Sequence, residues 1–331
     1  MQFDRLKRRE FVTLLGGTAA AWPLAARAQQ PVLPVIGFLS VLSPTLDELH
    51  LHGFIQGLNE AGYVENRNVA IEFRWAEGHY DRLPTLAADL VDRRVAVIMA
   101  GGPPAARVAK AATSTIPIVF TSGDDPVQIG LVPSLNRPRG NITGVHLFFS
   151  ELSAKKLGLL HDLLPQVTVI AAMLNPTSPS AERQAKDLQT AGRALGLQIH
   201  VVHASNGQEI EAAFNTFTRQ NVGAAIIGSD PGLYAWRDQI VALAARHAIP
   251  AVYEIREYVD AGGLMSYGTN VKDAYRLAAI YVGRILKGEK PADLPVMQET
   301  KFELVLNMKT AKTLGINIPD NVLSLVDDVI E

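Results

Sequence analysis

The chain has 331 residues, of which 48% are hydrophobic and 19% charged, with a formal net charge of −2 and no cysteine. The absence of cysteine excludes disulfides, thiolate metal and iron–sulfur sites, cysteine nucleophiles and a lipid-modified N-terminal cysteine. The near-neutral charge disfavours a nucleic-acid-binding protein, which usually carries a basic stripe that neutralises phosphates.

The first 28 residues have the pattern of an export signal. The basic run Lys7-Arg8-Arg9 precedes an apolar stretch at 12–26, and the segment ends in Ala26-Arg27-Ala28. The stretch is too short for a stable membrane span, and small-x-small is typical of a cleavage site. The pattern predicts a twin-arginine-like signal peptide, 1–28, cleaved after Ala28, and a periplasmic protein. An N-terminal amphipathic helix is the alternative.

From residue 32 onward, short apolar runs alternate with longer segments of helical period. Strands are predicted at 35–39, 69–73, 95–100, 116–121, 144–148, 167–174, 199–202, 224–228, 250–253 and 264–267, and helices at 46–61, 83–93, 181–195, 210–219, 234–247 and 273–286. Continuous apolar strands are expected where helices cover both faces of a parallel sheet. The pattern predicts an α/β protein with doubly wound, Rossmann-like sheets.

The same chemistry recurs at five strand-to-helix junctions: Ser43-Pro44, Gly102-Pro103, Asp125-Pro126, Ser178-Pro179 and Asp230-Pro231. Each has the pattern of a helix N-cap followed by proline at the first helical position. In a parallel sheet these junctions share the carboxyl edge, where helix N-termini favour anions. The pattern therefore predicts a polar rim suited to a ligand, although each junction alone is also an ordinary helix start.

A turn-rich stretch at 137–141 divides the chain into two series of β/α units, and the second begins at about residue 144. Each series is long enough for an independent core, and a cleft between two such sheets is a usual place for a small ligand.

Common catalytic motifs are absent from the sequence, including a phosphate-binding loop, a G-x-S-x-G nucleophile elbow and an H-E-x-x-H zinc helix. The closest histidine pairs are His50/His52 and His200/His203. We expect surface or packing roles for them, because His50 and His52 lie on different faces of a helix and the other pair lacks nearby carboxylates.

Adjacent carboxylates and clustered aromatics are the remaining candidates for a site. Asp124-Asp125 could perform acid–base or metal chemistry, but we favour Asp125 as an N-cap and Asp124 as a ligand contact in the cleft. Glu254 is a candidate counter-charge for an ammonium group, although an isolated Glu is more often solvated. The aromatic side chains include residues that would suit an apolar or aromatic ligand, namely Tyr80, Tyr234, Trp236, Tyr253, Tyr258 and Tyr267.

Four stretches resemble bacterial ABC-transporter substrate-binding proteins of the tryptophan/aromatic amino-acid-binding-like group. They are 104–120 (PAARVAKAATSTIPIVF), 123–145 (GDDPVQIGLVPSLNRPRGNITGV), 249–268 (IPAVYEIREYVDAGGLMSYG) and 304–319 (LVLNMKTAKTLGINIP), and the resemblance covers 32–330. It implies a type I periplasmic-binding-protein fold with two lobes, 32–143 plus 265–293 and 144–264 plus 294–331, which close like a hinge on a small molecule.

The resemblance also implies a binding function without catalysis, cofactor or metal. Its partner is then an ABC permease in the inner membrane, which receives the ligand; we also expect a monomer that binds no nucleic acid. The implied ligand contacts follow the strands: Ser40, Gly101, Gly102, Ser122, Asp124, Asn175, Ser229, Asp230, Tyr253 and Glu254. Helix N-termini and hydroxyls would hold a carboxylate, and Asp124, Asp230 or Glu254 would hold an ammonium group.

The sequence departs from the family pattern in two places. Gly102-Pro103-Pro104 stands where relatives often carry Gly-Thr-Pro, so a hydroxyl donor is missing. Arg139-Gly140 stands where relatives usually carry Gly-Gly, which places Arg139 in a backbone conformation normally adopted by glycine.

The function predicted from these patterns is a periplasmic solute-binding protein for ABC import, with a small amino-acid-like or aromatic carboxylate as ligand. Two alternatives stay open. One is an exported enzyme that uses the carboxylates of Asp124, Asp125 and Asp230, and the other is a periplasmic ligand sensor for a membrane receptor.

Overall fold

The computed structural model describes residues 33–331, so the predicted signal peptide and its cleavage site lie outside the described residues. The first of two β-sheets has the order β11-β5-β4-β3-β1-β2, and every neighbouring pair is parallel. Its strands are β1 (Val35–Ser40), β2 (Ala70–Trp75), β3 (Val97–Gly101), β4 (Ile118–Ser122), β5 (Ile142–His146) and β11 (Met297–Gln298).

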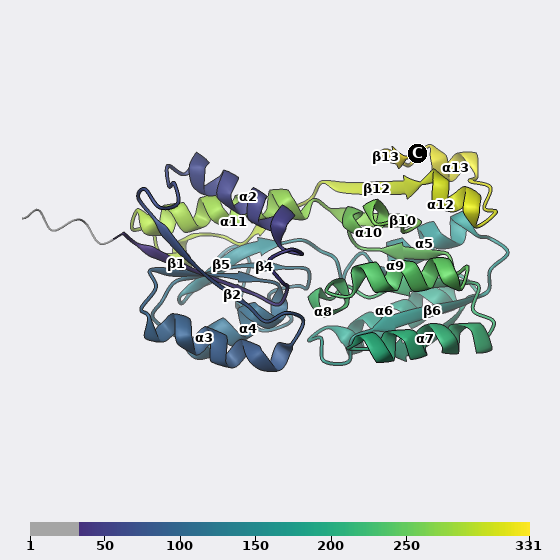
Figure 1. Ribbon diagram of the computed structural model, residues 1–331, viewed down its shortest axis with the longest axis horizontal. Helices are drawn as coiled ribbons and strands as arrows, with labels where there is room; N and C mark the ends of the chain where they lie inside the picture. The colour runs from purple at the N-terminus through teal and green to yellow at the C-terminus, as the bar shows by residue number, and fades with distance from the viewer. Residues whose placement is uncertain (1–32) are drawn as a thin grey trace, which may run out of the picture. The chain divides into compact units, whose positions relative to one another are not determined.

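Helices cover both faces of the first sheet (Figure 1). One face packs against α2 (Glu48–Glu60) and α11 (Val271–Leu286), and the other against α3 (Leu83–Asp92) and α4 (Pro103–Ala112). The short 3-10 helix η1 (Tyr80–Arg82) precedes α3, and η2 (Pro291–Asp293) follows α11. Because both faces are covered, β1, β3, β4 and β5 are almost entirely buried, which explains their continuous apolar runs.

The second sheet has the order β13-β12-β10-β9-β8-β6-β7, and only its β10–β12 pair is antiparallel. Its strands are β6 (Val169–Leu174), β7 (Gln198–His203), β8 (Ala224–Ile227), β9 (Ala251–Tyr253), β10 (Met265–Thr269), β12 (Phe302–Asn307) and β13 (Asp328–Ile330). Helices α5 (Ser153–Leu163) and α6 (Ala181–Ala194) pack on one face, and α7 (Gly207–Arg219) and α9 (Arg237–Arg246) on the other. The shorter helices are α8 (Pro231–Tyr234), α10 (Arg256–Asp260), α12 (Met308–Thr313) and α13 (Asp320–Leu323).

The predicted fold class is confirmed: the chain forms two doubly wound α/β sheets. One predicted helix is wrong in its extent: within 234–247 only Arg237–Arg246 forms a helix, α9, while Tyr234 is the last residue of α8, and Ala235 and Trp236 separate the two helices. Asp230 caps α8 and starts it earlier than the apolar period indicates. The patterns above also indicate no element after residue 286, where the structure has η2, three strands and two short helices.

Within residues 33–331, the chain passes between the two sheets three times. It crosses after β5, again between β10 and α11, and a third time between β11 and β12. The expected lobe boundaries differ from these crossings, since 143/144 falls inside β5, while 264/265 and 293/294 precede β10 and β11. Apolar periodicity locates a strand but does not indicate which sheet it joins, and here β5, β10 and β11 each finish in their sheet before the chain crosses.

The five proline junctions divide into two groups. Gly102-Pro103 and Asp230-Pro231 are N-caps with proline at the first helical position, as predicted. The other three predictions are wrong, because Ser43-Pro44, Asp125-Pro126 and Ser178-Pro179 begin turns. Helices α2 and α6 start later, with Asp47 and Ser180 as their N-caps.

Two backbone details distinguish local from tertiary constraints. Arg139 has φ 57° and is followed by Gly140 at φ 65°, so the prediction of a left-handed conformation for Arg139 is confirmed. Gly53 and Gly57 of α2 instead allow close helix packing. A Cβ on either glycine would lie 2.2 Å or 2.1 Å from a backbone oxygen of α11.

Within residues 33–331, no helix combines the length and apolar character that crossing a bilayer requires.

Candidate functional site

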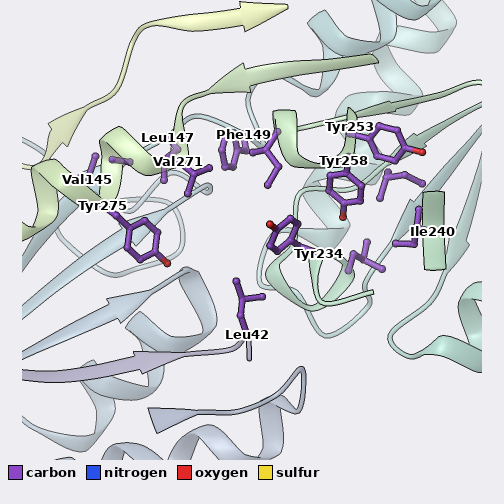
Figure 2. Close-up of a cluster of buried hydrophobic side chains, with 14 of the residues drawn as sticks. Leu42, Val145, Leu147, Phe149, Tyr234, Ile240, Tyr253, Tyr258, Val271 and Tyr275 are labelled. Atoms are coloured by element: carbon purple, nitrogen blue, oxygen red, sulfur yellow. The ribbon is translucent and has the colours of Figure 1, made fainter. Parts of the chain in front are cut away.

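A pocket lies where the carboxyl ends of strands from both sheets approach each other. Its volume is about 70 Å³, several times the roughly 10–15 Å³ that one water molecule needs by the same measure. Leu42, Phe149, Tyr234 and Tyr275 surround one space between the two groups of strands (Figure 2). An aromatic and apolar lining with a few polar groups is typical of small-molecule sites.

The structure brings seven of the ten predicted contact residues to the wall of this pocket. They are Ser40, Gly101, Gly102, Asp124, Ser229, Asp230 and Glu254. The other three lie outside the wall. Ser122 forms a turn with Asp124, Asn175 donates a hydrogen bond to Asp230, and Tyr253 is fully buried against Tyr258. Position after a strand predicted the right edge of each sheet, but it could not separate a lining side chain from one directly behind it.

The wall beside the first sheet offers few hydrogen-bond donors at the start of α4. Gly102 has φ 88° and donates its N–H to the Thr121 carbonyl at 3.1 Å. Pro103 and Pro104 occupy the first two helical positions, so of the first three helical residues only Ala105 keeps a backbone N–H. A helix N-terminus usually favours an anion, and here two of its donors are missing.

Asp124 follows β4 and is buried in the pocket wall. Ser150 donates a hydrogen bond to its carboxylate, and Ser122 Oγ donates to its carbonyl oxygen at 2.7 Å. Burial raises the pKa of Asp124, while the serine hydrogen bonds oppose that shift. Asp125 instead accepts from the Val127 N–H at 2.8 Å. The two adjacent carboxylates therefore have different surroundings, with Asp125 capping a turn and Asp124 in the pocket wall.

Asp230 follows β8 and is 2% exposed. Its carboxylate accepts hydrogen bonds from Asn175 Nδ2 at 2.7 Å, from the Leu233 N–H at 3.1 Å and from Tyr80 Oη at 2.7 Å. Burial raises its pKa, and the donors oppose the rise. Tyr80 lies in η1, beside the first sheet, so this bond joins the two sides of the pocket.

Glu254 and Lys156 form a buried acid–base pair beside Asp230. Glu254 follows β9 and is 5% exposed, while Lys156 of α5 is 1% exposed and donates from Nζ to Ser229 Oγ at 3.1 Å. Burial raises the pKa of Glu254 to about 8, and the ammonium of Lys156 opposes this rise. Burial lowers the pKa of Lys156, opposed by Glu254. The interpretation of Glu254 as a solvated side chain is wrong, because the fold encloses it.

Three carboxylates thus line the pocket, namely Asp124, Asp230 and Glu254, while one ammonium, that of Lys156, is buried outside the lining. Unpaired buried charge is unfavourable, and an excess of carboxylates favours a cation as the missing partner. The arrangement is therefore suited to a positively charged group on a ligand.

His50 of α2 also lines the pocket, so the expectation of a surface or packing role is incomplete. Its Nδ1 lies 3.1 Å from Asp47 Oδ1, and its ring stacks on Tyr275 with 4.8 Å between centroids. Asp47 is fully buried and also accepts from Trp75 Nε1 at 3.1 Å. The useful sequence signal was the Asp47/His50 spacing of three residues, which places both on one helix face. His52, two residues on, is exposed.

The other aromatic candidates lie at different depths. Tyr234 lines the pocket and accepts from Arg237 Nη1 at 3.0 Å. Tyr253 and Tyr258 stack behind it with 4.4 Å between ring centroids, and their buried hydroxyls have no hydrogen-bond partner (Figure 2). Phe149, Tyr275 and Lys156 were not indicated by the sequence, because they gain their position from the chain crossing, from α11 and from α5.

The second histidine pair lies away from the pocket, with His200 bonded to Gln220 at 2.8 Å. Among the residues that the structure describes, no group of three or more His, Asp or Glu side chains is arranged to hold a metal ion.

Comparison with known proteins agrees with this architecture. Residues 35–330 match the model of the ABC transporter substrate binding protein family. The chain therefore belongs to this family of binding proteins, and the predicted type I periplasmic-binding-protein fold is confirmed.

Three relatives illustrate the range of similarity. A tyrosine-binding protein from Clostridioides difficile is 26% identical over 82% of this chain and 77% of its own length. The crystal structure of an ABC domain from Streptococcus pneumoniae in complex with L-Trp is 28% identical, covers 89% of this chain and 100% of that chain, and has a TM-score of 0.80. A conserved domain protein from Vibrio cholerae is 24% identical over 89% of this chain and 99% of that chain, with a TM-score of 0.82.

Proposed function

We propose that this protein is a periplasmic solute-binding protein that delivers a small amino-acid-like or aromatic carboxylate ligand to an ABC importer. The observation that carries the proposal is the pocket between the two sheets, in which buried carboxylates adjoin aromatic side chains. The family membership supports the binding role. The names of two relatives, which mention tyrosine and L-Trp, support an aromatic amino acid as the ligand.

In this proposal the ligand's ammonium group binds at the carboxylates of Asp230, Glu254 and Asp124. All three are buried in the wall, and each pKa is raised by burial. A bound cation stabilises the ionised carboxylates and offsets the cost of burying them. Of the three, Asp230 is the best oriented, because three donors hold its side chain in one position.

The ligand's side chain would contact the aromatic part of the wall. Phe149 comes from the crossing after β5, Tyr234 from α8 and Tyr275 from α11. Aromatic pairs add stabilisation beyond the area that they bury, so such a lining favours a ring on the ligand.

Binding would couple to closure of two lobes about the three crossings. The first lobe contains the first sheet with α2, α3, α4 and α11, and the second contains the second sheet with its helices. A ligand that contacts both walls binds the closed arrangement more tightly than the open one and shifts the population toward it. Tyr80 contributes to the closed arrangement, because it bonds both the Asp230 carboxylate and, at 3.0 Å, the Gly232 N–H.

The ligand class is tested by measuring melting temperature and calorimetric binding with a panel of amino acids, aromatic acids and aromatic amines. We expect aromatic amino acids to raise the melting temperature, by the mass-action stabilisation of a ligand that binds only the folded state. A panel in which no compound shifts the melting temperature would contradict the ligand class. Co-purification with the permease, and ligand uptake that depends on this protein, would test delivery to an importer.

The same measurements separate the alternatives. Turnover of a bound compound by the purified protein would favour an exported enzyme, and abolition of that turnover in Asp124→Asn would assign it to this pocket. Ligand-dependent binding to a membrane receptor in place of a permease would favour a sensor. Export itself is tested by the N-terminal sequence of protein isolated from the periplasm, which should begin at Gln29.

A further inference from the structure

One polar atom in the pocket wall has no partner. His50 is 4% exposed, and its Nδ1 faces Asp47 Oδ1 at 3.1 Å. Its Nε2 is buried without any hydrogen-bond partner, although the residue lines the pocket. Buried polar atoms in folded proteins are nearly always hydrogen-bonded, so an unpaired nitrogen at a ligand pocket indicates a bond that the ligand completes.

The neighbours of His50 fix the orientation of that nitrogen. Asp47 is fully buried and is held from its other oxygen by Trp75 Nε1 at 3.1 Å. Asp47 Oδ1 accepts the hydrogen bond of Nδ1–H and orients the ring, so Nε2 is the nitrogen available to a ligand, and it donates to that ligand when both ring nitrogens carry a proton. The ring is also stacked on Tyr275, with 15° between the two planes.

The charge distribution of the pocket determines which ligand group this nitrogen suits. Among the described residues that line the pocket, His50 is the only one with a basic side chain, and Asp124, Asp230 and Glu254 are acidic. The start of α4 would otherwise attract an anion, but its first two residues, Pro103 and Pro104, have no backbone N–H to donate. A carboxylate on the ligand therefore has one side chain in the described wall that can carry a positive charge as its partner, the imidazole of His50.

We propose that His50, positioned by Asp47, binds the carboxylate of the ligand through Nε2–H. This inference rests on the proposed function and deepens it. The ligand's ammonium group meets the acidic cluster, and its carboxylate accepts from Nε2–H of a ring whose Nδ1–H is held by Asp47. The site thereby selects an amino acid over the corresponding amine.

The test compares an amino acid with the amine that lacks its carboxylate, using L-tryptophan with tryptamine and L-tyrosine with tyramine. His50→Phe keeps a ring against Tyr275 but removes Nε2, and His50→Gln keeps a polar group but removes the charge. For both variants we expect the affinity for the amino acid to fall between about 10-fold and 100-fold, the range for a hydrogen bond between charged groups. The affinity for the amine should change less than about threefold, because the amine makes no such bond.

His52→Gln is the matched control, since His52 is exposed on the same helix and should leave both affinities unchanged. Asp47→Asn tests the positioning role, and we expect it to reduce the ratio of amino-acid to amine affinity in the same direction. A packing role for His50 would lower both affinities equally, and that result would overturn the inference, as would unchanged amino-acid binding in both His50 variants.

These outcomes differ from failure of the proposed function. If the wild-type protein binds none of the four compounds, the ligand class itself is wrong, and the inference about His50 falls with it. If the wild-type protein binds the amino acids and the His50 variants bind them equally well, the ligand class stands and the role of His50 is refuted. Melting temperatures of all variants without ligand identify any variant that has lost its fold, and the second His50 variant then decides.

Discussion

The two walls of the pocket are built from opposite kinds of chemistry. The wall beside the second sheet carries buried ionisable groups, with Asp230 and Glu254 at its surface and Lys156 behind them. The wall beside the first sheet presents prolines at the start of α4 together with one imidazole, that of His50, and its carboxylate, Asp124, lies near the chain crossing. Two of the three lining carboxylates lie on one wall and the imidazole on the other, so a ligand that carries both an ammonium and a carboxylate group contacts both walls in the proposed binding mode.

This difference gives a physical reason for coupling between binding and closure. A ligand held at one charged end gains little by binding the open protein, because its other end stays in water. In the proposed mechanism, closure would bring the second partner within hydrogen-bond distance, and the ligand would discriminate between the two arrangements by the free energy of that second contact. The following experiments measure how much residues of each wall contribute to ligand affinity.

The largest effect is expected at Asp230. Asp230→Asn retains a side chain that can cap α8 but removes the negative charge. We expect amino acids and amines to bind about 100-fold more weakly or worse, because a buried charge partner is lost. Calorimetric titration measures the change, and Asp125→Asn is the control, since Asp125 caps a turn outside the pocket. A loss below about threefold would assign the ammonium group to another partner.

Glu254 should make binding depend on pH. A cationic ligand favours the ionised carboxylate, and the pKa of Glu254 is about 8 in the folded protein. Below that pH, binding releases a proton, so affinity should rise with pH by up to about tenfold per unit. Calorimetric titrations in two buffers of different ionisation enthalpy measure the number of protons released on binding. Glu254→Gln should release fewer protons than the wild type, because the proton lost by Glu254 is then absent. An affinity that is independent of pH between about 6 and 8 would contradict this assignment.

The same shift predicts the sign of a stability change. The pKa of Glu254 is raised from 4.5 to about 8 on folding, so the folded state retains a proton that the unfolded chain has released. This contribution to the free energy of unfolding is fully present below about pH 4.5 and is lost as the pH rises toward about 8. Urea unfolding of the wild type and Glu254→Gln across this range should show a smaller decline in the variant. Burial lowers the pKa of Lys156, so at higher pH this group makes the free energy of unfolding rise with pH, opposite in sign to the effect of Glu254. Both proteins contain Lys156.

A Tyr80 variant tests whether the hydrogen bonds between the two walls stabilise the closed arrangement when no ligand is bound. Tyr80→Phe removes the hydroxyl that bonds Asp230 Oδ2 at 2.7 Å and the Gly232 N–H at 3.0 Å. We expect about a 10-fold loss of affinity for all ligands, by the value of a hydrogen bond to a charged group. The radius of gyration of the ligand-free protein, from small-angle scattering, should increase. An unchanged radius together with unchanged affinity would show that Tyr80 does not stabilise the closed arrangement.

The smallest effect is expected at the start of α4. Pro103→Thr restores a backbone N–H and adds a hydroxyl at the first helical position, on the wall that lacks donors. The affinity for an aromatic amino acid should improve by about threefold to tenfold, as for one neutral hydrogen bond, with no change for the amine. Combined with His50→Gln, the same substitution should recover part of the lost amino-acid affinity. Equal effects on amine and amino acid would contradict an anion site on this wall.

Local sequence chemistry predicted the edge of the sheet at which the pocket lies. Strand ends followed by Asp230 and Glu254 were visible as a polar rim, and Arg139 was expected in the left-handed conformation that it adopts. Three of the five proline junctions proved to be turns, because a capping side chain before proline stabilises a turn as well as a helix. The spacing of His50 and His52 puts them on different helix faces and so gives no sign of a site, whereas the contact of His50 with Asp47 and its place in the pocket depend on the fold.

The sequence by itself determined what depends on near neighbours: the alternation of strands and helices, the doubly wound class and the family. Only the tertiary structure decided which sheet β5, β10 and β11 join, which predicted side chains line the pocket and which lie behind it, and how His50, Lys156 and Tyr80 meet the acidic cluster. The physical reason is that apolar period and capping act over a few residues. Burial, charge pairing and the pKa of Glu254 instead arise between groups as far apart in the chain as Tyr80 and Asp230.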